Sequence, residues 1–314
     1  MPEITHRGRT WQVAKGSNLL DALNDAGMNV PFSCRAGSCH ACLVRCLRGE
    51  PHDARPQALD PGRRLEGWRL ACQCSVAENL DVAVFDPARE GLPARVERLD
   101  WLDQRVLRLR LMPTERPLRY HAGQHVLLWN DSGVARPYSL ASVPWEDQWL
   151  EFHLDCRHSG AFCDAARTLT VGDTLRLGQP HTGALRYEPE WQMRPLLLLA
   201  AGTGLAPIWS LLREALHQKH QGPIRLLHVC RGTSYLQASL GALAKLNGNL
   251  SIEYVDREYA AGRLQSLRAT SRQEIALICG GSGFVEDCAK RMFLAGLPRG
   301  QVLGDAFLTR WTGG

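Results

Sequence analysis

The hydrophobic and polar residues follow three different patterns along the chain, and each pattern predicts a different kind of structure. Over residues 3–13 apolar and polar positions alternate around the turn HRGR, which predicts a pair of short strands. A helical repeat follows in LLDALNDAGM, where Ser17 can cap the helix and Gly27 can end it. Further strands are predicted in CLVRCLRG and LACQCSV. We therefore expect residues 1–88 to form a small β-rich domain, followed by the linker PAREGLP.

The middle and the end of the chain differ from this first part and from each other. Residues 93–190 contain short alternating strands such as RVLRLRLMP and WLEFHLDCR, separated by turn residues, which predicts an antiparallel barrel. In residues 191–314 a buried strand, PLLLLAA, leads through GTGLAP into the periodic helix IWSLLREALHQK. Apolar strands and helices then alternate, as in a parallel sheet. The pattern predicts a multidomain chain with a β-rich α+β part, an all-β barrel and an α/β part.

Composition limits the classes of protein that fit. A chain of 314 residues is longer than one core usually absorbs. No apolar run approaches the roughly 18 to 20 residues that cross a bilayer, so we expect no membrane insertion. Eleven cysteines in a chain of this length, with a polar start, indicate a reducing cytoplasmic location rather than a disulfide framework. The net charge of +5 without a basic block argues against nucleic acid and suits docking to an acidic partner.

Three cysteines with a distinctive spacing lie in CRAGSCHAC. Cys34, Cys39 and Cys42 follow the pattern Cys-x4-Cys-x2-Cys, which plant-type [2Fe-2S] clusters use with a distant fourth cysteine. Most intervening residues are small, so backbone N–H groups of a tight loop can point at the negative sulfurs. Two alternatives stay open. One is a set of buried structural thiols, and the other is a zinc site that uses Cys39, Cys42 and the two cysteines of LACQC, Cys72 and Cys74.

A second motif, RPYSLAS at residues 136–142, combines groups that suit a flavin. The Arg136 guanidinium can clamp a pyrophosphate, the Tyr138 ring can stack on an isoalloxazine, and the Ser139 hydroxyl can hydrogen-bond the flavin ring. Ser142 ends the motif and is included among the candidate cofactor-binding residues.

A third motif, GTGLAP, joins a predicted strand to a predicted helix. Gly202 and Gly204 allow the backbone to approach a pyrophosphate, and Pro207 fits the first helical turn, where its missing N–H costs nothing. The alternative is a tight βα turn without a ligand. A second glycine-rich loop, CGGSGFV, follows the last buried strand.

These motifs resemble those of known families. Residues 1 to about 86, with FSCRAGSCHACLV and LACQC, resemble the plant-type ferredoxin module, which has a β-grasp fold. RPYSLAS, GTGLAP and CGGSGFV resemble signatures of the ferredoxin–NADP reductase superfamily. The order of the parts is similar to that in reductases of bacterial multicomponent oxygenases. The resemblance implies a [2Fe-2S] ferredoxin domain at 1–88, an FAD-binding β-barrel at 93–190 and an NAD(P)-binding α/β domain at 191–314.

The resemblance also implies the fourth cluster ligand. In the plant-type arrangement the fourth cysteine follows the third at a distance that matches the 29 residues between Cys42 and Cys72. In a continuous strand, Cys74 would lie one pleat further, about 6.5 to 7 Å away. The expected ligands are Cys34, Cys39, Cys42 and Cys72.

For the flavin, the resemblance implies that Arg136 binds a phosphate, Tyr138 packs on the ring and Ser139 faces its reactive edge. A Gly-x-x-Ser/Thr turn commonly contacts the FAD pyrophosphate in that family. Here the corresponding turn begins at Gly160 and has Cys163 in place of the hydroxyl residue. Backbone amides of the turn can still bind phosphate, so we predict FAD rather than FMN.

For the nicotinamide coenzyme, the resemblance places Cys279 at the hydride-transfer position, with Gly280 beside it, so Cys279 and Ser139 are the predicted catalytic residues. GDAFL resembles the family's acidic-x-Phe ending, in which Asp305 or Phe307 approaches the flavin. Trp311 is predicted either to shield the flavin or to pack on the surface.

The predicted function is an oxidoreductase that passes electrons from NADH or NADPH through FAD to a [2Fe-2S] cluster and on to an electron-accepting protein, an oxygenase or its ferredoxin. Two alternatives remain: a redox-sensing or binding protein with a cluster or zinc and a vestigial flavin site, and a reductase for another partner such as a deoxysugar dehydratase. No acidic residue follows the second nucleotide-domain strand, where Arg231 can meet a 2′-phosphate. Since similar reductases mostly use NADH, we predict a preference for NADH.

Overall fold

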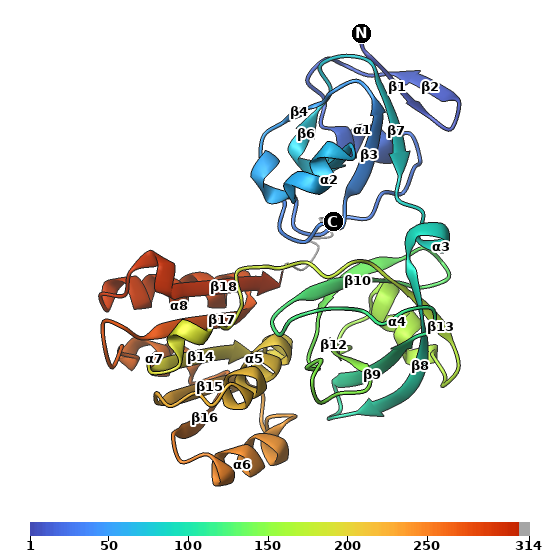
Figure 1. The fold of residues 1–314 in the computed structure, drawn as a ribbon. Coiled ribbons are helices and arrows are strands. Elements are labelled where there is room, and N and C mark those ends of the chain that lie inside the picture. Colours follow the sequence, from blue (N-terminus) through green and yellow to red (C-terminus); the bar gives the residue numbers. More distant parts are fainter. Residues whose placement is uncertain (308–314) are drawn as a thin grey trace. The chain divides into compact units, whose positions relative to one another are not determined.

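The computed structural model describes residues 1–307, and its strands form three main sheets that follow one another along the chain (Figure 1). The first sheet has the order β2-β1-β7-β3-β5. Its strands are β1 (Glu3–His6), β2 (Arg9–Gln12), β3 (Leu43–Arg48), β5 (Trp68–Leu70) and β7 (Leu80–Val84). β1 and β7 are parallel, whereas β3 is antiparallel to β5 and β7. Helix α1 (Leu19–Asp25) contributes Leu19, Leu20 and Leu23 to the core beneath this sheet.

The boundaries of this first part differ from the prediction in three places. Asn18, not Ser17, caps α1, because its Oδ1 accepts hydrogen bonds from the backbone N–H groups of residues 20 and 21. The strand expected through LACQCSV is interrupted: β5 ends at Leu70, η2 (Ala71–Gln73) is a 3-10 turn, and β6 (Cys74–Ser75) pairs with β4 (His52–Asp53). The linker PAREGLP contains the short helix α3 (Pro87–Glu90).

Two more short helices, η1 (Pro56–Ala58) and α2 (Pro61–Leu65), complete the first part, and the second sheet begins at residue 92. Its order is β11-β10-β13-β8-β9-β12. The strands are β8 (Leu92–Trp101), β9 (Val106–Pro113), β10 (His125–Trp129), β11 (Ala135–Ser139), β12 (Leu150–Asp155) and β13 (Thr174–Leu177). β10 is antiparallel to β13, β9 is antiparallel to both β8 and β12, and helix α4 (Ala161–Thr168) follows β12. The predicted antiparallel barrel is confirmed.

The third sheet is parallel and has the order β16-β15-β14-β17-β18. Its strands are β14 (Leu196–Ala201), β15 (Ile224–Cys230), β16 (Leu250–Asp256), β17 (Ile275–Gly281) and β18 (Val302–Phe307). The associated helices are α5 (Leu205–His217), α6 (Gln237–Leu246), α7 (Ala260–Ser266) and α8 (Ser282–Leu294), with the 3-10 turns η3 (Pro189–Trp191), η4 (Gly202–Gly204) and η5 (Arg299–Gln301). The predicted α/β architecture is confirmed.

In this α/β part, helices lie on both faces of the parallel sheet (Figure 1). Alternate residues of β14 therefore face the two different helix layers. Leu196 and Leu198 pack in one core with residues of α5 and α6, whereas Leu197 and Leu199 pack in another with residues of α7 and α8. The chain proceeds from β14 to β15 and β16, then returns to place β17 on the other side of β14. In such sheets ligands bind at this reversal, outside the carboxyl ends of the strands.

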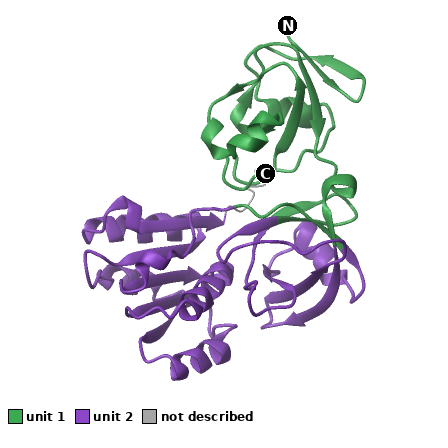
Figure 2. Ribbon diagram, in the orientation of Figure 1, with its two compact units in different colours: residues 1–93, 127–137, 175–181 green, residues 94–126, 138–174, 182–314 purple. Residues whose placement is uncertain are grey.

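By packing, the chain forms two compact units (Figure 2). One contains residues 1–93, 127–137 and 175–181, and the other contains residues 94–126, 138–174 and 182–314. The division into domains at 1–88, 93–190 and 191–314 stays a proposal, supported by the three successive sheets. Within residues 1–307, no helix is both long and apolar enough to span a membrane.

Candidate cofactor sites

The cysteine loop between α1 and β3 is shaped by its backbone. Arg35, Gly37 and His40 all have φ in the left-handed region, at 48°, 79° and 54°. This curled path directs N–H groups at sulfur: the backbone N atoms of Ala36 and Cys39 both lie 3.3 Å from Cys34 Sγ. A Cβ on Gly37 would lie 3.2 Å from the Ala58 side chain, so the loop is also closely packed there. Backbone donors aimed at sulfur stabilise negative thiolates.

The four predicted ligands form two hydrogen-bonded pairs of thiols. The Cys39 thiol donates to Cys34 and lowers the pKa of Cys34 to about 4, while burial and Cys34 raise the pKa of Cys39. In the same way the Cys42 thiol donates to Cys72 and lowers the pKa of Cys72 to about 7. Two irons that share a set of four cysteine ligands take two thiolates each, so this pairing fits a [2Fe-2S] cluster. Among residues 1–307, no three His, Cys, Asp or Glu side chains gather as on a single metal ion.

Cys72 and Cys74 have different surroundings. Cys72 lies on the 3-10 turn η2, where its Sγ accepts hydrogen bonds from Gln73 Nε2, at 3.1 Å, and from the backbone N–H of Gly37. Cys74 is only 1% exposed and packs in the hydrophobic core, and burial raises the pKa of its thiol. Cys72 and Cys74 therefore do not lie one pleat apart on a continuous strand. The turn gives the two sulfurs different surroundings and supports Cys72 as the ligand.

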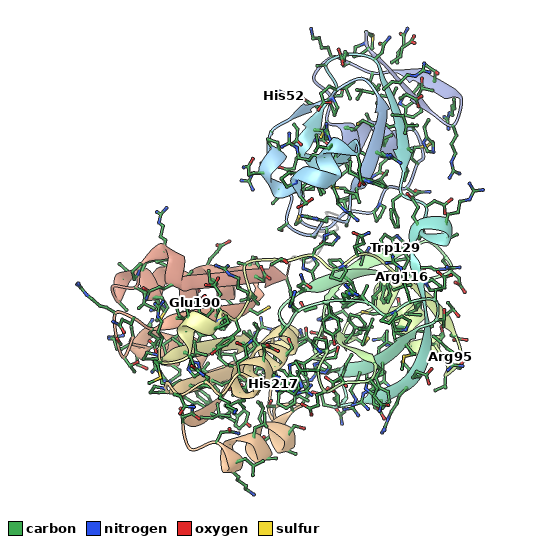
Figure 3. The ribbon with its side chains drawn as sticks, in the orientation of Figure 1. His52, Arg95, Arg116, Trp129, Glu190 and His217 are labelled. Carbon is green, nitrogen blue, oxygen red and sulfur yellow. The ribbon has the colours of Figure 1, made fainter. Side chains whose placement is uncertain are left out.

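The cysteine loop also contacts a strand of the second sheet within the same compact unit. Cys39 and Ala41 pack in a small apolar cluster with Leu127 and Trp129, both on β10. Trp129 is labelled in Figure 3. The Phe85 ring stacks on Trp129 with centroids 5.0 Å apart. This contact brings a predicted cluster ligand against β10 within this compact unit.

The predicted flavin residues Arg136, Tyr138 and Ser139 lie on β11, and all three are partly buried. Arg136 Nη1 donates to the carbonyl oxygen of Ala135 at 2.7 Å, and within residues 1–307 no carboxylate pairs with its guanidinium. The group therefore keeps donors for an anion such as a diphosphate. The Tyr138 ring lies 5.1 Å from the Phe162 ring at the start of α4.

Ser142 has a different environment from these three. It is 0% exposed, and its Oγ accepts from Tyr120 Oη at 2.8 Å and from the backbone N of Glu151 at 3.1 Å. The hydroxyl thus stabilises the barrel interior, and we leave Ser142 out of the proposed flavin site. Burial alone would raise the pKa of Glu151, but hydrogen bonds from His153 and Arg110 lower it to about 2.

Gly160 is the N-cap of α4, and Cys163 is the third residue of the helix. The Gly160 N–H is used within the turn, because it donates to Asp164 Oδ2 at 3.0 Å. The amides of residues 161–163 have no acceptor within the helix by geometry and are the donors that this turn can offer to a phosphate.

Four predicted nucleotide-site residues meet where the sheet order reverses. Gly202 and Gly204 lie in η4, directly after β14, and Cys279 and Gly280 lie on the neighbouring strand β17, just before its last residue. A Cβ on Gly204 would lie 2.2 Å from the Cys279 carbonyl oxygen, and one on Gly280 would lie 2.9 Å from the Ala201 side chain. Gly202 has φ +54° and open space in front of it. The lack of a side chain at Gly204 and Gly280 therefore permits close packing between β14, η4 and β17. At Gly202 the backbone is open to a ligand. Cys279 itself is 0% exposed.

A buried histidine that the sequence did not indicate holds this loop. His228, on β15, is 0% exposed, and its Nε2 lies 3.0 Å from the Gly202 carbonyl oxygen. Since a carbonyl only accepts, Nε2 carries the hydrogen, and Nδ1 accepts from Ser234 Oγ at 2.8 Å. Burial lowers the pKa of His228 to about 4, so the ring is neutral near pH 7. The only signal in the sequence is a histidine inside the apolar strand IRLLHVC.

An acidic residue stands beside Arg231, although no acid follows β15 in the sequence. It is Asp256 at the end of β16, paired in register with Cys230. Its carboxylate accepts from the backbone N atoms of Gly232 at 2.8 Å and Glu258 at 3.0 Å, and these bonds lower its pKa. Arg231 is exposed, and its charge also lowers that pKa.

The end of β18 lies at the same carboxyl edge of the parallel sheet, where the nucleotide crevice is predicted. Asp305 is in register with Cys279, and its Oδ1 accepts from the Ala184 backbone N at 3.0 Å. Phe307 is in register with Gly281 and packs partly against the hydrophobic core. Trp311 lies outside the described residues.

Three family models match successive stretches of the chain. Residues 3–77 match the 2Fe-2S iron-sulfur cluster binding domain, residues 99–187 the oxidoreductase FAD-binding domain, and residues 198–290 the oxidoreductase NAD-binding domain. With the geometry above, these matches define an iron–sulfur flavoprotein oxidoreductase whose cofactors are a [2Fe-2S] cluster, FAD and NAD(P)H.

Whole proteins are also similar to this chain. Reductase component 1 of terephthalate 1,2-dioxygenase from a Comamonas species is 30% identical, over 96% of this chain and 95% of that protein. A CDP-6-deoxy-L-threo-D-glycero-4-hexulose-3-dehydrase reductase from Yersinia pestis is 28% identical, over 67% of this chain and 65% of that protein. The crystal structure of the Amycolatopsis cytochrome P450 reductase shares the fold, with a TM-score of 0.65, 24% identity and coverage of 98% and 99%.

The chain belongs to the family of ferredoxin reductase-type electron-transfer components that includes the Comamonas reductase. It passes electrons from NAD(P)H through FAD to a [2Fe-2S] cluster and on to a partner. This confirms the predicted reductase and removes the alternative of a binding protein with a vestigial flavin site.

Proposed function

We propose that this reductase prefers NADH and delivers single electrons to the terminal oxygenase of a multicomponent system or to that system's ferredoxin. When bound, the nicotinamide supplies a hydride, the flavin divides its two electrons, and the cluster passes them on one at a time. The chain's own residues bind and orient these groups. The proposed cluster ligands are Cys34, Cys39, Cys42 and Cys72, and the observation that supports them is the pairing of these four thiols.

For the flavin, we propose that Arg136 binds the diphosphate, Tyr138 packs on the ring and Ser139 hydrogen-bonds its reactive edge. The amides that begin α4, after Gly160, add donors for the second phosphate, which favours FAD over FMN. Truncation of Arg136 to Ala removes charged contacts worth about 1.5 to 3 kcal/mol, so the variant should purify depleted of flavin but with its cluster. Full flavin occupancy in that variant would contradict this role.

At the nucleotide crevice, Gly202, Gly204 and Pro207 are proposed to bring the start of α5 to the coenzyme diphosphate. Cys279 and Gly280 are proposed to form the wall beside the nicotinamide, and Phe307 to lie toward the flavin. Because Cys279 is fully buried, its role there is to shape the hydride-transfer position rather than to exchange a proton with solvent.

The preference for NADH rests on Asp256. A carboxylate at the end of a strand of a dinucleotide-binding sheet can accept hydrogen bonds from ribose hydroxyls, and it repels a 2′-phosphate. Arg231 lies close enough to Asp256 to lower its pKa, so the acid also neutralises the residue that could bind that phosphate. Initial rates with each coenzyme and an artificial acceptor test this proposal. Catalytic efficiency at least tenfold higher with NADPH would overturn it.

The proposed partner is based on the partners named for similar reductases. The terephthalate dioxygenase reductase supports an oxygenase partner, and the Yersinia protein keeps a deoxysugar dehydrase as the second candidate. Electron transfer from the NADH-reduced chain to each type of acceptor, measured under anaerobic conditions, distinguishes them.

The cysteine usage supports a cytoplasmic location, since none of the eleven cysteines forms a disulfide.

A further inference from the structure

Two cysteines outside the cluster loop lie together at the start of α4. Cys156 directly follows β12 and is 3% exposed, whereas Cys163 is partly exposed and is the third residue of α4. The Cys163 thiol donates to the carbonyl oxygen of Asp155 at 3.3 Å, which places it against the backbone next to Cys156. The Cys156 thiol donates to Cys163 Sγ. Together with the contact of Cys163 Sγ to the residue before Cys156, this hydrogen bond makes the two sulfurs neighbours.

The pair is also connected to the proposed flavin site. The Tyr138 hydroxyl hydrogen-bonds Cys163 Sγ, and its ring lies 5.1 Å from Phe162, the residue before Cys163. Cys163 therefore positions the aromatic ring that is proposed to pack on the flavin. A serine or threonine at this position would give the same hydrogen bond without redox chemistry.

We propose that Cys156 and Cys163 form a peroxide-sensitive dithiol whose oxidation to a disulfide loosens the flavin. The effect on flavin binding rests on the proposed role of Tyr138 in the flavin site. The formation of the disulfide does not depend on that role. The Cys163 thiolate attacks hydrogen peroxide to give a sulfenic acid and hydroxide. The Cys156 sulfur then attacks the sulfenic sulfur, and a disulfide forms as water leaves, so two thiols and one peroxide yield one disulfide and two waters.

The surroundings favour Cys163 as the sulfur that reacts first. Its thiolate is stabilised by the hydrogen bond from Cys156, with a further contribution from Tyr138 and the charge of Arg167, and these bring its pKa to about 7 against the effect of burial. Cys156 is more deeply buried, and the pKa of its thiol is raised by the bond to Cys163 and by burial. Reactive cysteines combine thiolate character with access to solvent, and a resolving thiol lies beside them.

The test treats the purified holoprotein with increasing hydrogen peroxide, blocks free thiols with N-ethylmaleimide and digests the chain with trypsin. Cleavage after Arg157 leaves the two cysteines on different peptides, so only a disulfide keeps them joined. The linked peptides should appear at a lower peroxide concentration than the one that bleaches the cluster. They should disappear after reduction with dithiothreitol and be absent in Cys163→Ser and Cys156→Ala. Cys288→Ala, a buried cysteine of α8, is the matched control and should behave like the wild type.

Flavin retention is measured in the same samples by fluorescence of the filtrate. The loss of one hydrogen bond to Tyr138 should raise the flavin dissociation constant about fivefold in the oxidised wild type. In Cys163→Ser a hydroxyl replaces the thiol as the partner of Tyr138, so the flavin dissociation constant of this variant should be the same with and without peroxide. The inference is overturned if Cys163 is oxidised without a link to Cys156, or if the linked protein holds flavin as tightly as the reduced one. A protein that purifies without any flavin would instead contradict the proposed function.

Discussion

The cluster loop and the nucleotide crevice are built in opposite ways. The loop takes three of its four proposed ligands from nine consecutive residues, 34–42, and its own backbone N–H groups point at the Cys34 sulfur. The crevice instead assembles short pieces from the ends of β14, β15, β16 and β17, which the strand order brings to one edge of the sheet. A locally built site is visible as a spacing in the sequence, whereas a topologically built site becomes visible only with the fold.

The glycines of the two regions also differ in what they do. In the loop, Gly37 takes a left-handed backbone conformation that lets the chain curl around sulfur. In the crevice, Gly204 has an ordinary φ, but any side chain there would meet the carbonyl oxygen of Cys279. Loss of a glycine should therefore disturb chain conformation in the first region and strand-to-loop packing in the second.

The largest expected effect separates Cys72 from Cys74. Cys72→Ser removes one of the four paired thiols, so the cluster should be lost or severely destabilised while flavin reduction by NADH survives. Cys74→Ser should keep a normal cluster spectrum and electron transfer to cytochrome c, because that sulfur lies in the apolar core. Iron content and visible absorbance measure both. The opposite result would assign the fourth ligand to Cys74 and invalidate the pairing described here.

The next effect concerns the buried histidine of the crevice and has a defined pH range. The folded pKa of His228, about 4, is lower than the ordinary value of 6.5, so the neutral ring contributes stability that is present above pH 6.5 and is lost as the pH falls toward 4. The loss can reach about 3 kcal/mol. His228→Gln should lack this component of the pH dependence, measured as urea unfolding midpoints at pH 7.5 and 4.5. The exposed His121→Gln serves as control, and equal pH profiles in wild type and His228→Gln would refute the burial argument.

The difference between the two regions explains what could be predicted from the sequence. The cluster spacing and the order of strands and helices were sufficient for the fold class and for the candidate cysteines. The break of the strand at Ala71–Gln73 was not visible, because it depends on the pairing of Cys74 with Asp53 in a separate short sheet. Ser142 lies in the RPYSLAS motif, but only the fold shows that its hydroxyl already accepts hydrogen bonds from Tyr120 and from the Glu151 backbone.

A smaller effect tests the role of packing in the crevice. In Gly204→Ala the new Cβ would lie 2.2 Å from a backbone oxygen, which cannot rotate away, so we expect destabilisation of about 1 to 3 kcal/mol and a higher KM for NADH. Gly241→Ala is the matched control, because Gly241 lies inside α6 with nothing within 4 Å and should gain about 0.5 to 1 kcal/mol. Thermal unfolding compares the two. If both variants shift in the same direction, steric packing is not the reason for Gly204.

The smallest expected effect tests whether the crevice discriminates between coenzymes through a residue that no local motif indicates. Asp256→Ser removes the carboxylate that would accept from the ribose of NADH and that opposes a 2′-phosphate, and it leaves Arg231 available for that phosphate. We expect kcat/KM for NADH to fall about tenfold, equivalent to about 1.4 kcal/mol, and kcat/KM for NADPH to rise. Glu258→Ser, which changes an exposed acid two residues away, should leave the ratio of the two efficiencies unchanged.

The alternative outcome has a structural cause. Because Asp256 also accepts from the Gly232 backbone N–H, loss of the carboxylate that only loosened this loop would lower both efficiencies together. Only a change in their ratio supports recognition of the ribose, and an unchanged ratio would assign Asp256 to holding the loop after β15.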